Sequence, residues 1–174
     1  MHNETLTIMS NFIAGLDAFV IPGTNHPMVL DVGAKTVGGT DSYRQLFPKR
    51  WIYYGLDVEA GENVDIVVTD PYDWLGMDNR FDLVISGQAF EHIEFPWLTI
   101  KQVEKVMKPG GHAVLIAPST GWIHRYPVDC WRFLPDGWNA LAKWAGLKVI
   151  RSDISAQEPW FDCFCLLQKE SRHD

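Results

Sequence analysis

Residues 28–39 read MVLDVGAKTVGG, an apolar run that ends in an acid and a glycine and then passes into a glycine-rich loop. Short apolar runs of this kind suit strands that are buried on both faces of a parallel sheet. Glycine lets the backbone approach a ligand closely, and amides at the start of a helix receive carboxylate or phosphate oxygens. Lys35 precedes the pair Gly38 and Gly39, so the spacing matches neither the dinucleotide pattern G-x-G-x-x-G nor the phosphate loop. This stretch predicts a strand followed by a ligand-binding loop or by a plain tight turn.

Similar apolar runs recur along the chain and alternate with helical patterns. The apolar stripe of Trp97–Met107 predicts one helix, and the pattern of Asp136–Ala145 predicts another. Apolar residues between Leu6 and Phe19 are spaced as on a helix, and Asp41–Phe47 forms a shorter helical stretch. This alternation is typical of an α/β protein with a mainly parallel sheet. The strands are predicted at Met28–Val32, Ile52–Leu56, Val64–Val68, Phe81–Ile85, Ala113–Ala117 and Leu147–Ile150.

One connection between two predicted strands is unusually short. Only Val58–Asn63 separates the run that ends at Asp57 from the run that starts at Val64. Parallel strands are normally joined by a dozen or more residues that include a helix. A connection of this length spans at most about 20 Å, just enough to return along a strand. We therefore expect the sheet to lack this crossover helix.

Composition limits the classes of protein to which the chain can belong. It has 174 residues, with 15 basic and 22 acidic side chains and a net charge of −7. This length predicts one domain that covers residues 1–174. An excess of acid with no block of Lys or Arg argues against a nucleic-acid partner. No apolar stretch reaches the roughly 20 residues of a membrane crossing and no signal peptide is recognised, so we expect a soluble protein without a membrane partner.

The cysteines indicate the compartment. The three of them, Cys130, Cys163 and Cys165, cannot all pair within the chain, which favours a reducing cytoplasmic location. Cys163 and Cys165 should lie on one face of a strand. Further ligands at a suitable spacing are missing from their neighbourhood, so we expect these thiols to pack in the core rather than bind a metal.

Acidic residues follow three of the predicted strands. Asp31 ends the first, Asp57 the second and Asp70 the third. A carboxylate at the tip of the strand beside a glycine loop can accept hydrogen bonds from both ribose hydroxyls of a nucleoside, and an adenine amino group is a plausible partner for Asp70. Each acid alone would be read as a solvated strand end. Three on one sheet edge indicate a nucleoside site.

These residues occur in the order and spacing of a known family. The chain resembles the class I S-adenosylmethionine-dependent methyltransferases, and especially the small members similar to methyltransferase type 11. The resemblance covers about residues 27–118 and implies a Rossmann-like sheet of strand order 3-2-1-4-5-7-6 with an antiparallel last strand at Trp160–Gln168. It rests on Asp31-Val32-Gly33, Gly55-Leu56-Asp57, Thr69-Asp70, Phe81–Ser86, Glu91-His92 and Met107–Gly111.

The resemblance also implies a cofactor, S-adenosylmethionine, and the residues that hold it. In the family's usual loop, glycine stands at the position of Lys35, so the loop around the methionine carboxylate departs from the pattern here. The implied contacts are Asp31, Gly33, Ala34, Lys35, Gly38 and Gly39 for the methionine part, Asp57 and Val58 for the ribose, Asp70 and Pro71 for the adenine, and Ser86 and Gln88 near the sulfonium.

The segment Ser119–Leu134 is long, aperiodic and rich in side chains that bind ligands, which is more typical of a functional loop than of an idle one. Within it, His124–Phe133 resembles a segment of small methyltransferases associated with sugar or polysaccharide modification. An ion-pair network and a hydrophobic anchor that pin the loop are the alternative interpretation. The predicted substrate contacts are Trp122, Arg125, Tyr126, Asp129, Trp131 and Arg132.

Two histidines are candidate bases. A hydroxyl acceptor must lose a proton near the transition state, and histidine titrates near neutral pH. His92 follows the fourth strand, with Glu91 as its orienting partner, and His124 lies in the long loop. Alternatively, His92 caps a helix start through the backbone and His124 is an exposed loop residue. No cluster has the ligand spacing of a metal site, so none is expected.

The sequence therefore favours an enzyme that transfers methyl groups from S-adenosylmethionine to an oxygen or nitrogen of a small polar acceptor, such as a sugar or glycan precursor. The alternative is a regulatory protein that binds the nucleoside or the cofactor without turnover. A nicotinamide-dependent dehydrogenase is disfavoured because the glycine loop lacks the dinucleotide spacing.

Overall fold

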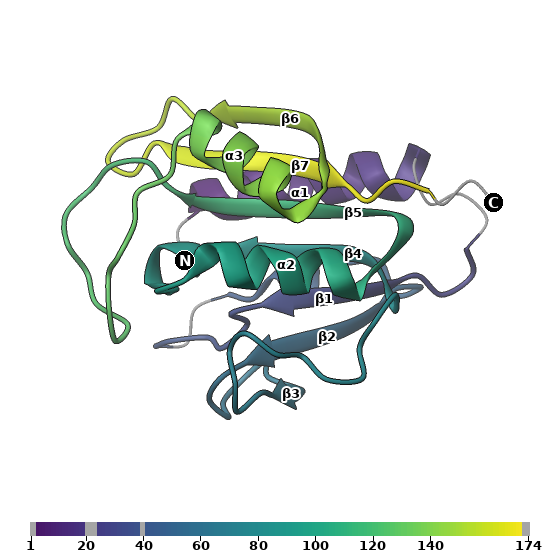
Figure 1. The fold of residues 1–174 in the computed structure, drawn as a ribbon. Helices are drawn as coiled ribbons and strands as arrows, with labels where there is room; N and C mark the ends of the chain where they lie inside the picture. Colours follow the sequence, from purple (N-terminus) through teal and green to yellow (C-terminus); the bar gives the residue numbers. More distant parts are fainter. Residues whose placement is uncertain (1–2, 20–23, 39–40, 172–174) are drawn as a thin grey trace.

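A computed structural model describes residues 3–19, 24–38 and 41–171 and shows one seven-stranded sheet with helices on both faces (Figure 1). The strand order is β3-β2-β1-β4-β5-β7-β6, and β7 runs antiparallel to both of its neighbours. The predicted fold is confirmed. The elements are α1 (Asn3–Phe19), β1 (Met28–Val32), η1 (Tyr43–Leu46), β2 (Ile52–Asp57), β3 (Ile66–Val67), β4 (Phe81–Gly87), η2 (Phe90–His92), α2 (Pro96–Val106), β5 (Met107–Pro118), α3 (Pro135–Ala145), β6 (Lys148–Ile154) and β7 (Asp162–Gln168).

Several strands differ in length from the prediction, among them β6, which extends to Ile154. At the sheet edge, β3 pairs only with β2 and is confined to two residues, so much of the predicted run 64–68 is not strand. In contrast, β5 begins at Met107, directly after α2, and so includes the Lys-Pro-Gly-Gly segment before the run predicted from Ala113. Gly110 adopts a φ of 79° within it, a conformation that glycine allows inside an irregular strand.

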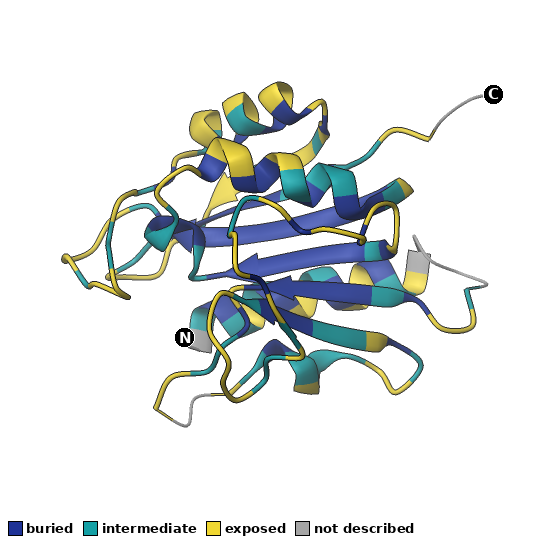
Figure 2. Ribbon diagram, turned by 60° about the horizontal axis from the view of Figure 1, so that its bottom comes forward, coloured by how far each residue is buried: buried dark blue, intermediate teal, exposed yellow. Residues whose placement is uncertain are grey.

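The helices divide between the two faces of the sheet. Helices α2 and α3 pack on one face and α1 on the other (Figure 1), which leaves the central strands buried on both sides (Figure 2). Side chains of β7 alternate accordingly. Cys163 and Cys165 join the core under α2 and α3, whereas Phe164 faces α1. The predicted core packing of these thiols is confirmed.

A polar network takes the place of a helix between β2 and β3. Residues 58–65 contain no helix, as predicted from their length. The side chain of Arg44 donates to Asn63 Oδ1 at 2.8 Å and contacts Asp65, whose carboxylate accepts from the Gly55 amide at 2.8 Å. Arg44 belongs to η1, a 3₁₀-helix that replaces the helical stretch predicted for residues 41–47.

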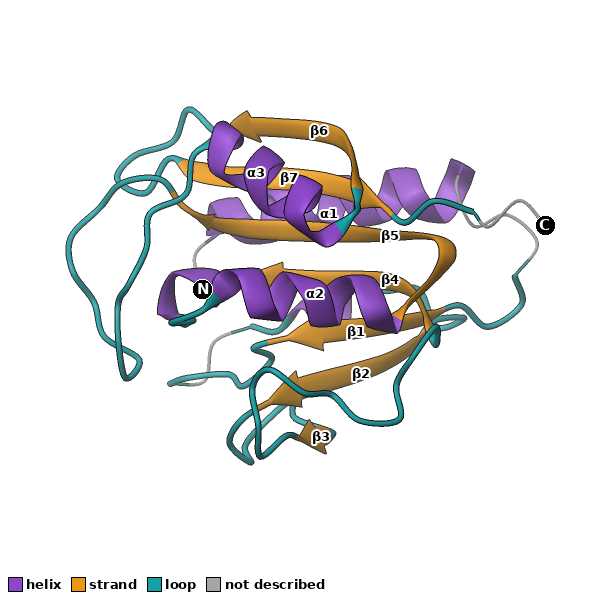
Figure 3. Cartoon of the chain, in the orientation of Figure 1, coloured by secondary structure: helices purple, strands orange, loops and turns teal. Residues whose placement is uncertain are grey.

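One end of the sheet collects the loops. The parallel strands point their carboxyl ends toward the side where residues 119–134 form a long excursion without helix or strand (Figure 3). Ligands of open α/β sheets bind at this edge. Within the part of the chain that the structure describes, no helix has both the length and the apolar character needed to cross a membrane.

Candidate active site

A cavity of about 870 Å³ opens at the carboxyl ends of β1, β2 and β4. This volume lies in the upper part of the range of roughly 300–1,000 Å³ that small-molecule sites occupy. Its wall includes residues 31–37 from the end of β1, 56–59 from the end of β2, 87–89 and 91–94 from the end of β4, and 124–128 from the long loop. One cavity therefore joins the glycine loop to both candidate histidines.

Asp31 lines the end of the cavity beside the glycine-rich loop. Its side chain is buried and accepts a hydrogen bond from the Tyr53 hydroxyl. Burial raises the pKa of Asp31 to about 7, because the charged carboxylate loses its water. The Tyr53 hydrogen bond and the nearby Arg44 charge lower this pKa, and Asp57 raises it. This carboxyl group therefore titrates near neutral pH and responds to a charged ligand.

Gly33 lets the loop turn sharply at the end of β1. The amides of Gly33 and Ala34 both donate to the Leu56 carbonyl, at 2.9 and 3.1 Å, which ties the loop to β2. Gly33 has a φ of 77°, and a Cβ at this position would lie 2.4 Å from the Cβ of Ala89. Both the backbone conformation and the contact with the turn after β4 require glycine here.

Lys35 is accommodated despite its departure from the usual loop. Its backbone does not enter the positive-φ region, so the position does not require glycine. The Lys35 amide donates to Asp57 Oδ2 at 3.0 Å, and its ammonium group donates to Glu59 at 2.6 Å. The other carboxylate oxygen of Asp57 accepts from the Glu59 amide at 3.2 Å. Each carboxylate oxygen can accept two hydrogen bonds, so Asp57 retains acceptor capacity.

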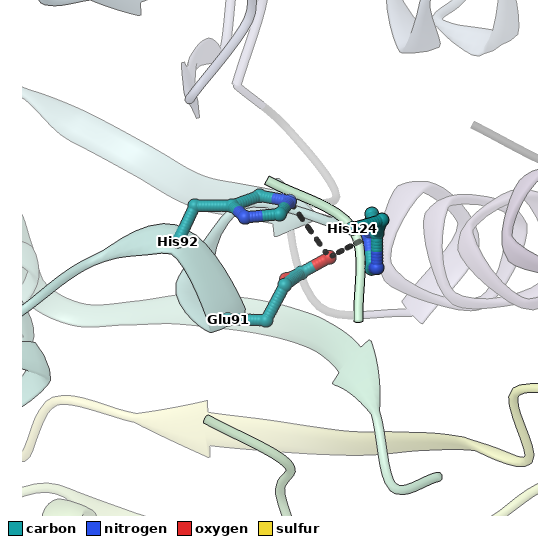
Figure 4. Close-up of side chains that lie close together, drawn as sticks. All are labelled: Glu91, His92 and His124. Atoms are coloured by element: carbon teal, nitrogen blue, oxygen red, sulfur yellow. Dashed lines mark ion pairs between the residues drawn. The ribbon is translucent and has the colours of Figure 1, made fainter. Parts of the chain in front are cut away.

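At the opposite end of the cavity, two imidazole rings converge on one carboxylate oxygen of Glu91 (Figure 4). Nε2 of His92 lies 3.6 Å, and Nε2 of His124 lies 3.9 Å, from Oε1 of Glu91. The Glu91 side chain is fully buried, and neither of its carboxylate oxygens has a hydrogen-bond partner among the described residues. Burial raises the pKa of Glu91 to about 8 and lowers the pKa of His92.

The far nitrogens of these histidines are held by acceptors. Nδ1 of His92 donates to the Val128 carbonyl at 2.6 Å, and Nδ1 of His124 lies 3.3 Å from the Trp122 carbonyl. Because a carbonyl oxygen can only accept, Nδ1 carries the proton in each ring. The neutral rings then present the lone pair of Nε2 to Glu91.

The long loop is pinned by its own charges and by η2. Arg132 donates to both carboxylate oxygens of Asp129, at 2.6 and 2.9 Å, and holds the pKa of Asp129 well below its usual range. The amides of Cys130 and Trp131 donate to the Glu91 carbonyl, at 2.7 and 3.2 Å. The Trp131 indole donates to the Ile93 carbonyl. These contacts fix the loop over the end of β4.

Comparison with known proteins agrees with this geometry. Residues 30–115 match a family model described as "Methyltransferase domain". Residues 30–115 therefore form a methyltransferase domain. A curated relative, 2-methyl-6-phytyl-1,4-hydroquinone methyltransferase 1, chloroplastic, from Oryza sativa subsp. japonica, is 32% identical over 78 residues, which are 44% of this chain and 24% of that protein. The match thus spans about a quarter of the relative's length.

Solved structures share the fold of the methyltransferase domain at low identity. The 1,6-didemethyltoxoflavin-N1-methyltransferase of Burkholderia thailandensis, solved with bound 1,6-didemethyltoxoflavin and S-adenosylhomocysteine, superposes with a TM-score of 0.70 at 14% identity, covering 96% of this chain and 79% of that one. The cyclase SpnF superposes with a TM-score of 0.69 at 13% identity, covering 95% and 81%. At such identities the likeness concerns the fold.

Most residues that the sequence assigned to the methyltransferase site line the cavity. Gly38 and Asp70 do not, and the Asp70 side chain accepts from the Tyr72 amide. Ser86 is buried and donates to the Val32 carbonyl. Gly39 lies outside the described residues. The lining residues are Asp31, Gly33, Ala34, Lys35, Asp57, Val58, Pro71, Gln88, His92, His124, Arg125 and Tyr126.

The remaining predicted substrate residues of the methyltransferase domain, Trp122, Asp129, Trp131 and Arg132, lie outside the cavity lining. The Asp129–Arg132 pair matches the loop-pinning alternative that the sequence left open. Their contact with a substrate stays a prediction, as do the roles of the lining residues.

The structure adds residues that the sequence analysis did not assign to the site. Tyr43 and Trp160 line the cavity, and the Tyr53 hydroxyl donates a hydrogen bond to the Asp31 carboxylate. Glu91 was considered only as an orienting partner of His92, although it also faces His124. The adjacent pair Glu91-His92 was the signal, but nothing in the sequence indicates that the loop returns His124 to it.

Proposed function

We propose that this protein transfers the methyl group of S-adenosylmethionine to an oxygen or nitrogen of a small polar acceptor, such as a sugar or glycan precursor. The observation that carries the proposal is the single cavity joining the acids Asp31 and Asp57 to the Glu91–His92–His124 group. The methyltransferase domain of the chain supports the reaction class. The three cysteines form no disulfide, which supports a cytoplasmic location as part of the proposal.

The cavity suits the cofactor at its glycine-loop end. Asp57 retains acceptor capacity for the ribose hydroxyls, and the Asp31 carboxylate would attract the ammonium group of the methionine part. Lys35 pairs with Glu59, and residues 33–37 of the loop line the cavity. When bound, S-adenosylmethionine supplies an electrophilic methyl group on a sulfonium centre.

The protein's own groups position the acceptor and remove its proton. A methyl transfer needs alignment of the attacking atom in a site shielded from water. The end of the cavity beside Glu91, His92 and His124 is here called the acceptor end. Arg125 and Tyr126 line it and can hold polar groups there. A hydroxyl acceptor must also lose a proton, and His92 and His124 are the basic side chains beside that end. The lone pairs of both Nε2 atoms face inward for this step.

Replacing Asp57 with Ala should weaken cofactor binding strongly. Each charge-assisted hydrogen bond contributes about 1.5–3 kcal/mol, which corresponds to roughly a 10- to 150-fold rise in Kd. Titration calorimetry with S-adenosylmethionine and S-adenosylhomocysteine measures this change. Asp153→Ala, an exposed carboxylate on β6, is the matched control and should leave Kd unchanged. If neither ligand raises the melting temperature of the wild-type protein at millimolar concentration, the proposed function is wrong.

Cofactor affinity should increase with pH through the titration of Asp31. A cationic ligand binds the ionised carboxylate, whose pKa is raised to about 7 by burial in the free protein. Protonation at low pH therefore competes with binding, and Kd should tighten about 10- to 30-fold between about pH 5.5 and 7.5. Arg44, Tyr53 and Asp57 are the charged and titratable groups that face this carboxyl group.

Calorimetry at both pH values tests this dependence, with two controls. Adenosine lacks the ammonium group and should bind with the same Kd at both pH values. Asp31→Asn should remove the pH dependence for S-adenosylhomocysteine while leaving adenosine binding intact. A pH dependence that persists in Asp31→Asn would assign the titration to another group.

Binding without turnover is the second candidate. The SpnF structure, named as a cyclase, shows that this fold is not restricted to proteins named as methyltransferases. The observation against a mere binding protein is the buried acid and histidine group beyond the cofactor end, which nucleoside binding alone would not require. Formation of S-adenosylhomocysteine in the presence of sugars, polyols and amines distinguishes the two functions.

A further inference from the structure

At the acceptor end, the lone pairs of one carboxylate oxygen and two imidazole nitrogens face one another. Oε1 of Glu91 faces Nε2 of His92 at 3.6 Å and Nε2 of His124 at 3.9 Å, and neither carboxylate oxygen has a hydrogen-bond partner among the residues that the structure describes. Both imidazoles direct their protonated Nδ1 to carbonyl oxygens, so Nε2 offers a lone pair. Burial disfavours the ionised form of the Glu91 carboxyl group, and a cation among these atoms would stabilise that form.

We propose that Glu91, His92 and His124 bind a divalent transition-metal ion of the Zn²⁺ or Mn²⁺ type. Their three ligand atoms lie within 4.8 Å of one another. Ligand atoms around such an ion are about 3–3.5 Å apart, given metal–ligand bonds near 2.1 Å. Closing the group requires shifts of about 1–1.5 Å. His92 and His124 face Glu91 from two segments of the chain (Figure 4), and small rotations of their side chains can supply this movement while the loop stays pinned.

Outer partners already orient the ligands. Metal-binding histidines usually donate their second ring nitrogen to a carbonyl or carboxylate. The Val128 carbonyl takes this role for His92. For His124, Nδ1 lies near the Trp122 carbonyl and 3.6 Å from Asp129, whose carboxylate also accepts from the His124 amide at 2.7 Å. Arg132 fixes that carboxylate in turn.

The ligand set favours particular metals. Two imidazoles and one carboxylate suit zinc and first-row transition metals, whereas Mg²⁺ and Ca²⁺ prefer sites made of oxygen alone. Three protein ligands leave coordination positions open, as in catalytic rather than structural sites. The three residues line the cavity, so the open positions face the acceptor end. A metal ion here would select a hydroxyl acceptor, because a cation lowers the pKa of a hydroxyl group it contacts. This choice of acceptor rests on the proposed function.

Metal titration of chelator-treated protein tests the site directly. Co²⁺ and Zn²⁺ should each bind with one ion per chain, and Ca²⁺ should not compete. Glu91→Gln, which keeps the shape of the side chain, and His124→Ala should weaken Kd by at least about 100-fold, and Asp129→Asn by about 10- to 100-fold. His26→Ala, an exposed histidine distant from the cavity lining, is the matched control and should bind as the wild type does.

Two results would overturn the metal site. One is the absence of saturable binding of Co²⁺ and Zn²⁺ to the wild-type protein at millimolar concentration. The other is unchanged binding in the double variant His92→Ala/His124→Ala, which would place the ion elsewhere. Binding of S-adenosylhomocysteine by each variant shows that it is folded. If the wild type binds metal but neither S-adenosylmethionine nor its product, the proposed function fails and the metal site stands.

Discussion

The variants His124→Ala and His92→Ala should lower kcat by about 10²–10⁴ with any hydroxyl acceptor that supports turnover. Both histidines are needed at the acceptor end, each as a base or as a metal ligand, because both Nε2 atoms converge on Glu91. The cofactor contacts Asp31 and Asp57 lie at the other end of the cavity. The Kd for S-adenosylhomocysteine should therefore stay within about twofold of the wild-type value, so that the loss concerns the transition state.

Steady-state kinetics and calorimetry on the same preparations separate the two effects. His26→Ala serves as the control, since this histidine is exposed and does not line the cavity. A parallel loss of cofactor affinity in His92→Ala or His124→Ala would assign that residue to structure. Turnover that is insensitive to both substitutions would indicate an acceptor that is already nucleophilic, such as an amine, and would remove the need for a base.

Replacing Trp138 with Ala should cost about 3–5 kcal/mol in the free energy of unfolding. Trp138 is fully buried in α3 and stacks on Phe133 with ring centres 4.3 Å apart. It also meets the edge of Phe90 at 5.2 Å. Phe133 belongs to the long loop and Phe90 precedes Glu91, so this aromatic group joins the acceptor end to the core.

Urea unfolding measures the change, and two variants make the result interpretable. Trp138→Phe keeps an aromatic ring in the core and should cost less than about 1.5 kcal/mol. Trp144→Ala removes a tryptophan from the same helix at a site that is 60% exposed, and should change stability by no more than about 0.5 kcal/mol. A similar loss in Trp138→Ala and Trp144→Ala would contradict the role of the aromatic group.

The sheet could be predicted because burial on both faces imposes a simple pattern. β1 and β4 are mostly apolar and were predicted within two residues of their observed bounds, whereas β5 was predicted from Ala113 and begins at Met107. The missing helix between β2 and β3 followed from chain length alone. The resemblance supplied the order of the strands. The bounds of β3 were missed because an edge strand has one neighbour and its length depends on pairing rather than on its own composition.

The two ends of the cavity differ in how far sequence could reveal them. Asp31 and Asp57 were recognised because parallel strands bring their carboxyl ends to one edge. The approach of His124 to Glu91 depends on where an aperiodic loop folds back. That path is set by backbone hydrogen bonds from Cys130 and Trp131 to the Glu91 carbonyl, which leave no periodic trace in the sequence.

The polar network between β2 and β3 has a consequence for the motions of the molecule. Apolar packing under α2 and α3 holds β5 and β7, whereas the β2–β3 corner relies on Arg44, Asn63 and Asp65 in partly exposed positions. Segments with few buried contacts open locally at a smaller free energy than the core does. Amide hydrogen exchange should therefore be fastest at this corner. The part of the cavity wall that carries Asp57 would then open transiently while the remainder of the sheet stays folded. A nucleoside could enter and leave the cavity through this opening without movement of the long loop.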